Sequence, residues 1–276
     1  MAFKYAYQTG GLWGDVYEGV KRLARIGYDA VEIVGIPSYF HEAEKIKKAV
    51  NAEGLIVSSM IPMSRDIDLS FPRIEERKNG INLLFRTLDF ANALECKKLV
   101  VGPTRLAKWT PLASYEDELK WSAESIAEVA DYAKGKGITL CIEAWNRYDT
   151  YLINTAKKCR EFVDTIKRDN VGVMLDTFHL NIEEVDMAKA ILDSRGYLVH
   201  LHVGDSNRAA PGMGHMDFVP LMKALKEIDY QGHVTMELLP PAADPKTYQD
   251  MNDMTAFFEE FPATALKTLK AIEKTL

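Results

Sequence analysis

The stretch Val171-Gly-Val-Met-Leu-Asp-Thr-Phe-His-Leu180 decides how the rest of the chain is interpreted. Its apolar first half predicts a buried strand that ends abruptly at Asp176, and His179 follows three residues later, where we expect a loop. A buried carboxylate without a partner is costly, so Asp176 must interact with another group. Two interpretations are open at this point: a helix cap or surface ion pair, and a ligand of a bound cation.

A strand followed by a helix is the pattern that repeats along the whole chain. The expected strands cover residues 3–7, 30–34, 55–60, 98–101, 138–143, 171–176, 197–202 and 233–237. The expected helices cover residues 15–26, 42–53, 72–94, 114–134, 154–167, 181–193, 218–228 and 255–273. Right-handed crossovers between parallel strands, in a chain of 276 residues, predict a single (β/α)8 TIM barrel over residues 1–276. An open doubly wound sheet is the alternative, but residues 9–13 lack its GxGxxG turn.

Composition narrows the class of protein. A hydrophobic fraction of 47% provides a core, and a net charge of −6 argues against nucleic acid or an anionic membrane as the main partner. Residues 1–7 lack the apolar region of a signal peptide, and no later run is long enough to span a membrane, so we expect a cytoplasmic protein. Cys96, Cys141 and Cys159 form no CxxC pair, which predicts neither disulfides nor a zinc knuckle.

Four consecutive strands are expected to end in side chains that can bind a metal: Glu143, Asp176, His202 and Glu237. The carboxyl ends of barrel strands meet at one rim, so these groups should converge. Neighbouring carboxylates repel one another unless a cation neutralises them. Carboxylates with one imidazole favour manganese, with cobalt or magnesium as alternatives, over a structural zinc. For each residue, a helix cap, a salt bridge or a buried polar contact is the alternative.

Two more residues lie close to this set in the predicted barrel. His200 faces the same side of its strand as His202, one layer deeper, so we expect a core histidine or a partner of a ligand. Glu32 is near the end of the second strand, where it can reach the rim or serve a surface or structural purpose.

Four motifs resemble those of the ketose 3-epimerases, the D-tagatose and D-psicose 3-epimerases of the sugar phosphate isomerase/epimerase superfamily. They are CIEAWNRYD at 141–149, MLDTFH at 174–179, HVGDSNR at 202–208 with PGMG at 211–214, and MEL at 236–238. The likeness extends over nearly the whole chain and is strongest from the fifth strand onward. It implies the same (β/α)8 fold, of the xylose isomerase-like type.

The resemblance also implies roles for individual residues. Glu143, Asp176, His202 and Glu237 would hold one divalent metal, and the two glutamates would be the acid/base pair. One glutamate removes the proton at C3, a cis-enediolate forms beside the cation, and the other glutamate returns a proton to the opposite face. His179 and Arg208 occupy the positions that hold O1 and O2 of the sugar. A homodimer or homotetramer is implied as well.

The sequence departs from the family pattern in places that affect the substrate. Asp149 stands where the family has a glutamate, so a hydrogen bond to the sugar is lost or passed to water. The segments 5–7 and 101–103 also differ from the family's aromatic pair and double glycine. Trp13 and Trp109 are predicted to form an apolar wall against the far end of the sugar, with simple packing as the alternative.

The leading hypothesis is therefore an isomerase that epimerises a free ketose at C3 with the help of a metal. Other enzymes share its enediolate chemistry: an aldose–ketose isomerase, an inosose dehydratase or a C-glycoside-cleaving lyase. A metal-dependent AP endonuclease is more remote, because its trinuclear zinc site needs more histidines and the acidic balance opposes DNA binding. A barrel that only binds a sugar is the remaining alternative.

Overall fold

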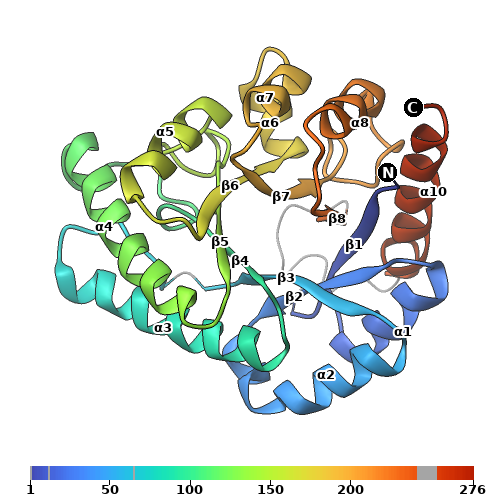
Figure 1. The fold of residues 1–276 in the computed structure, drawn as a ribbon, viewed down its shortest axis with the longest axis horizontal. Helices are drawn as coiled ribbons and strands as arrows, with labels where there is room; N and C mark the ends of the chain where they lie inside the picture. The colour runs from blue at the N-terminus through green and yellow to red at the C-terminus, as the bar shows by residue number, and fades with distance from the viewer. Residues whose placement is uncertain (1, 12, 65, 241–253) are drawn as a thin grey trace.

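The computed structural model describes residues 2–11, 13–64, 66–240 and 254–276. Eight parallel strands close into a barrel in chain order, and the helices form a ring around it (Figure 1), which confirms the predicted (β/α)8 fold. The strands are β1 Lys4–Thr9, β2 Ala30–Gly35, β3 Ile56–Pro62, β4 Lys98–Val101, β5 Thr139–Glu143, β6 Val171–Asp176, β7 Leu198–Val203 and β8 His233–Met236. The helices are α1 Val16–Ile26, η1 Pro37–Glu42, α2 Ala43–Ala52, α3 Ile74–Ala93, α4 Tyr115–Lys134, α5 Ala156–Ile166, α6 Thr177–Glu183, α7 Met187–Asp193, α8 Phe218–Glu227, η2 Ala256–Glu260 and α10 Phe261–Glu273.

Side-chain oxygens mark where several helices begin. Asp15 accepts hydrogen bonds from the backbone N–H groups of Tyr17 and Glu18, which have no partner inside α1. Gly27 ends α1 in the left-handed conformation, with a φ of 99°, which glycine adopts at low cost. These local signals place α1 within one residue of its predicted start.

The strand-helix unit that begins with β6 differs from the prediction. The helix α6 follows β6 at once, so His179 lies in a helix and not in a loop. The single helix expected at 181–193 is instead two helices, because Asp186 caps a second one by accepting from the N–H of Lys189 at 2.9 Å. The loop expected before residue 255 falls largely on residues 241–253, outside the described ranges.

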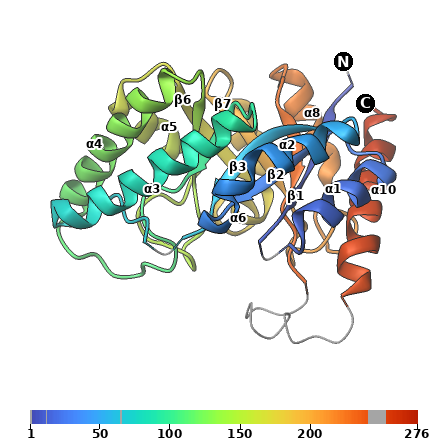
Figure 2. The ribbon, with the colours of Figure 1, turned by 90° about the horizontal axis from the view of Figure 1, so that it is seen from below.

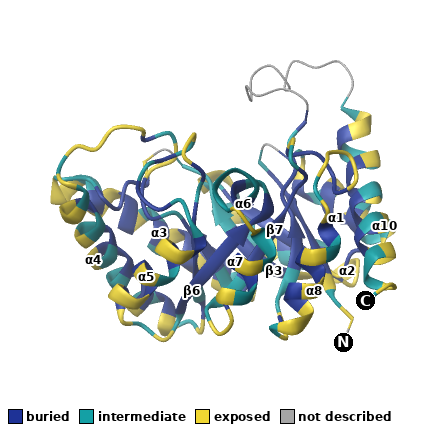
Figure 3. Ribbon diagram, turned by 90° about the horizontal axis from the view of Figure 1, so that it is seen from above, coloured by how far each residue is buried: buried dark blue, intermediate teal, exposed yellow. Residues whose placement is uncertain are grey.

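The interior of the barrel is filled in layers by alternate strand residues. Val100, Cys141 and Met174 form a buried apolar cluster, and two of them lie two positions before Glu143 and Asp176. This apolar cluster lies one layer below the carboxyl rim on the side of β4, β5 and β6. Figure 3 shows buried residues along the strands and exposed residues on the outer faces of the helices.

The last helix completes the outer ring. In Figure 2, α10 lies beside α1, so the first and last units of the chain are neighbours, as β1 and β8 are in the sheet. All three cysteines are buried and free. None of the helices in the described ranges combines the length and the apolar composition that a membrane crossing requires.

Candidate metal centre and active site

The four side chains expected to bind a metal come together at the carboxyl rim of the barrel. Glu143 and Asp176 end β5 and β6, His202 is next to last in β7, and Glu237 directly follows β8. One potential ligand atom from each lies within 4.8 Å of the others. All four residues are buried. Their oxygen and imidazole donors fit a divalent cation such as manganese.

Asp176 caps a helix and forms an ion pair, as the first interpretation of its stretch expects, and its two oxygens have different partners. Oδ1 caps α6 by accepting from the N–H of Phe178 at 2.9 Å. Oδ2 accepts from Nη1 of Arg208 at 2.5 Å. Capping the helix fixes the carboxylate at the end of β6 and leaves the second oxygen for the cluster.

Arg208 is a buried cation inside this cluster, not a solvated loop residue. Its guanidinium also donates to Glu237. Burial would lower the pKa of Arg208, but Asp176 and Glu237 outweigh this and hold the pKa above its ordinary value. The backbone of Arg208 is in the left-handed region, with a φ of 64°, a conformation uncommon outside glycine that often marks functional sites.

The carboxylate of Asp205 stabilises the loop that carries Arg208. Its side chain accepts from three backbone N–H groups of this loop, those of Ser206, Gly212 and Met216. Its carbonyl accepts from the N–H of Arg208 at 2.8 Å. The turn that aims Arg208 at the cluster is therefore stabilised by hydrogen bonds within the loop.

The two glutamates of the cluster have different electrostatic surroundings. Burial, followed by repulsion from Glu237, raises the pKa of Glu143 to about 8. Burial would also raise the pKa of Glu237, but the charges of Arg208 and His202 outweigh it and lower the pKa to about 2. A divalent cation between the carboxylates would favour the ionised form of Glu143. Without one, the raised pKa favours the protonated form of Glu143.

His179 is held beside the cluster by Asn146, a residue that sequence reasoning missed. Nδ1 of His179 accepts from the backbone N–H of Asn146 at 3.3 Å and lies 2.7 Å from its side-chain amide nitrogen. Burial lowers the pKa of His179 to about 4, so the ring is neutral near pH 7 and its proton is on Nε2. Nε2 lies 3.6 Å from Glu143 and 3.8 Å from Asp176. The N–H group is therefore at the edge of the cluster.

Asp149 lies on the far side of the His179 ring. Its Oδ2 is 3.7 Å from Nδ1 of His179 and accepts from the side chain of Asn146 at 2.9 Å. Its carbonyl accepts from the N–H of Ala107 at 3.0 Å, and Lys108 forms an isolated bridge with Thr150. The loop after β4 thus supports the turn that carries Asp149.

That loop is anchored by a buried network that the sequence did not reveal. Nζ of Lys108 lies 3.0 Å from Glu118 and 3.3 Å from Asp68, and the Lys108 side chain is only 3% exposed. Tyr151 donates a hydrogen bond to Glu118. The loops after β3 and β4 and the first turn of α4 therefore meet at one lysine.

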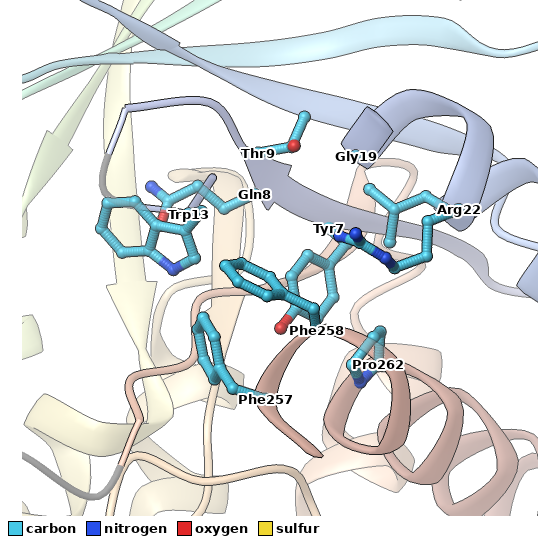
Figure 4. Close-up of a pocket in the computed structure, with 10 residues that line it drawn as sticks. Tyr7, Gln8, Thr9, Trp13, Gly19, Arg22, Phe257, Phe258 and Pro262 are labelled. Atoms are coloured by element: carbon cyan, nitrogen blue, oxygen red, sulfur yellow. The ribbon is translucent and has the colours of Figure 1, made fainter. Parts of the chain in front are cut away.

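The two tryptophans lie in different environments. Trp13 is buried, and its indole N–H donates to the carbonyl of Leu238 at 2.7 Å, next to Glu237. It lines a cavity of about 10 Å³ between β1, α1 and the C-terminal helices (Figure 4). Trp109 is 65% exposed, and its N–H donates to the carbonyl of Tyr148 at 2.6 Å. An apolar wall made by both rings stays a prediction.

Two further polar residues lie in the interior below the cluster. Glu32 is fully buried, which excludes the surface role considered from the sequence. His200 is also buried, with Nε2 2.8 Å from Oε2 of Glu32. The expected place of His200, one layer below His202, is confirmed.

A closed (β/α)8 barrel with this cluster at its carboxyl rim defines a class, the xylose isomerase-like TIM barrels, and the family model of that description matches residues 20–255. The chain is 40% identical over 242 residues to the D-psicose 3-epimerase of Enterocloster bolteae, covering 84% of this chain and 80% of that protein. It is 30% identical over 244 residues to the 3-dehydro-D-guloside 4-epimerase of Escherichia coli, covering 86% and 92%. A crystal structure of a D-psicose 3-epimerase in the presence of D-fructose has a TM-score of 0.86 at 27% identity, covering 98% and 99%.

Within that class, the chain belongs to the ketose 3-epimerase family. It is an enzyme of the isomerase class, a carbohydrate epimerase.

Proposed function

We propose that the protein epimerises a free ketose at C3 with one divalent metal, most suitably manganese, held by Glu143, Asp176, His202 and Glu237. The convergence of their ligand atoms within 4.8 Å is the observation that carries the proposal. Relatives that act as D-psicose 3-epimerases support the substrate class. When bound, the cation supplies electrophilic stabilisation of the negative charge that develops on a substrate oxygen.

In the proposed reaction, Glu143 and Glu237 act on opposite faces of the sugar. One of them removes the proton at C3, and the other donates a proton to C3. One glutamate, as a carboxylate, takes the proton, and the electrons of the C3–H bond form a C2–C3 double bond while the carbonyl electrons move to O2. The other glutamate, as a carboxylic acid, then donates its proton to C3 from the opposite face, and the carbonyl re-forms. These acid and base roles require one glutamate to be ionised and the other protonated at the start of each turnover.

The proposed substrate contacts surround this pair. His179 would donate from Nε2, because Asn146 occupies its Nδ1. Arg208 would donate from the guanidinium that now pairs with Asp176 and Glu237. Asp149, Trp13 and Trp109 remain the proposed contacts to the rest of the sugar.

Exchange in deuterated water tests the function directly. Manganese-loaded enzyme is incubated with fructose, psicose, tagatose and sorbose, and each product is analysed by NMR. We expect deuterium at C3 together with the C3 epimer. Glu143→Gln and Glu237→Gln should each abolish epimerisation, and metal content is measured in parallel because both residues are proposed ligands. Absence of exchange from all four ketoses would refute the proposal.

Epimerisation at C4 of a 3-keto glycoside is a second candidate, supported by the Escherichia coli 3-dehydro-D-guloside 4-epimerase. The proton removed is again next to a carbonyl, so the same two glutamates would suffice. Adding that substrate to the exchange panel distinguishes the candidates, since deuterium would appear at C4. An aldose product would instead identify an aldose–ketose isomerase.

The proposed homodimer or homotetramer is supported by exposed apolar side chains at the rim. Leu106, Trp109, Leu112 and Tyr148 are each at least half exposed on the loops after β4 and β5. Light scattering coupled to size-exclusion chromatography measures the mass of the particle, and a monomer at all concentrations would contradict this proposal.

A further inference from the structure

The barrel interior below His202 contains a carboxylate that the proposed reaction does not use. Glu32 is 0% exposed and comes from β2, which β1 and β8 separate from β7. Removing a carboxylate from water is costly unless it is paired and hydrogen-bonded. The contacts of Glu32 therefore indicate why the fold retains it.

Both oxygens of Glu32 face nitrogen atoms. Oε2 pairs with Nε2 of His200 at 2.8 Å, and Oε1 lies 2.8 Å from Nε2 of His202. Gln8 donates to Oε1 at 3.2 Å. An ionised carboxylate only accepts hydrogen bonds, so Glu32 favours a proton on Nε2 of each imidazole; at His202 the contact is an ion-pair approach of 2.8 Å, and the hydrogen bond of that ring is made by Nδ1.

The other nitrogen of His202 faces the cluster. Its Nδ1 lies 2.9 Å from Oε2 of Glu237. With Nε2 protonated, Nδ1 is the nitrogen that a cation can bind there, once the cation displaces the proton that Nδ1 shares with Glu237. A carboxylate on the outer nitrogen of a metal-binding histidine also fixes the ring and increases its basicity.

We propose that Glu32 is a positioning residue for the metal centre: it holds the Nε2 proton of His202 and so presents Nδ1 as the ligating nitrogen. His200 and Gln8 in turn hold Glu32 in place. This inference rests on the metal site of the proposed function.

Glu32, His200 and His202 could themselves be taken for a metal site, because their ligand atoms also lie within 4.8 Å of one another. A hydrogen bond from His200 and an ion-pair contact with His202 account for the short distances to Glu32, however, and His202 would have to serve two metals. Our proposal therefore requires one metal per chain, and two metals per wild-type chain would overturn it.

A pair of matched variants tests the role of Glu32. Glu32→Gln removes the charge of Glu32. Glu118→Gln is the control, because it removes the charge of a carboxylate that is also 0% exposed but pairs with Lys108 and not with a histidine. Calorimetric titration of the metal-free proteins with Mn²⁺ should show a dissociation constant about 10–100-fold higher for Glu32→Gln, and no change for Glu118→Gln. The absorption spectrum of the cobalt-loaded enzyme should change only in Glu32→Gln.

Equal affinity and equal cobalt spectra for wild type and Glu32→Gln would overturn the inference while leaving the metal site intact. A wild-type protein that binds no Mn²⁺ would refute the proposed metal site itself, so the two failures are distinguishable.

A measurement on the wild type covers the case in which Glu32→Gln does not fold. Long-range ¹H–¹⁵N NMR of the zinc-loaded protein reports which nitrogen of each histidine carries the proton. We expect protonated Nε2 in His202. Protonated Nδ1 in His202 would overturn the inference.

Discussion

Arg208 donates from Nη1 to Oδ2 of Asp176 at 2.5 Å, and both groups are buried at the carboxyl rim. The arginine is thus a cation that already offsets part of the charge of the cluster. Breaking a buried ion pair by removing one partner is costly, because the other charge stays behind.

Arg208→Met should therefore lower the free energy of unfolding of the metal-free protein by about 3–5 kcal/mol, as measured in urea. Added Mn²⁺ should stabilise the variant more than the wild type, because the ion replaces the lost charge. Identical urea midpoints for the two metal-free proteins would show that Arg208 does not stabilise the cluster.

Asp149→Glu should change substrate preference more than metal binding, since Asp149 contacts Asn146 and lies beside His179 but is not a proposed ligand. Gaining or losing one hydrogen bond to the sugar corresponds to about a tenfold change in relative kcat/KM among ketoses. Metal content should stay at the wild-type value. Asp169→Glu, at a surface position with a 72% exposed side chain, is the control. An unchanged ranking of all substrates would contradict this role.

Lys108→Met should destabilise the protein by about 3–5 kcal/mol, because Asp68 and Glu118 lose their shared buried cation. The double variant with Glu118→Gln should lose less than the sum of the single variants. Lys134→Met, which breaks an exposed pair with Asp169, should leave the free energy of unfolding nearly unchanged. Additive losses in the double variant would mean that Lys108 and Glu118 are not coupled.

His233→Gln should flatten the pH dependence of stability on the acid side. Burial lowers the pKa of His233 from 6.5 to about 4, so between these values the unfolded chain binds a proton that the folded protein does not. The stability contributed by the neutral ring is complete above pH 6.5 and is lost as the pH falls to about 4. The part of the free energy of unfolding that depends on this titration is at most about 3 kcal/mol, and it is smaller than this limit because the ring is partly exposed.

Urea unfolding between pH 7 and 4 provides the measurement for this histidine. His41→Gln is the control, because its side chain is 77% exposed. Parallel stability profiles for wild type and His233→Gln would contradict the assignment.

The sequence alone determined the barrel and the members of its rim cluster. Strand-helix alternation predicts parallel strands, and parallel strands of a barrel place their carboxyl ends together. For this reason Glu143, Asp176, His202 and Glu237 were identifiable from four separate segments. The boundaries were less accurate: β7 extends one residue past His202, and β8 ends one residue before Glu237.

Only the tertiary structure determined which atoms are in contact at the rim and in the interior of the barrel. Local pattern left Asp176 open between helix cap and ligand, whereas the structure shows one oxygen capping α6 and the other paired with Arg208 among the converging side chains. It also placed Glu32 against His200, 168 positions along the chain. Such a contact depends on barrel closure and strand register, which are set by packing over the whole chain and not by the residues on either side of Glu32.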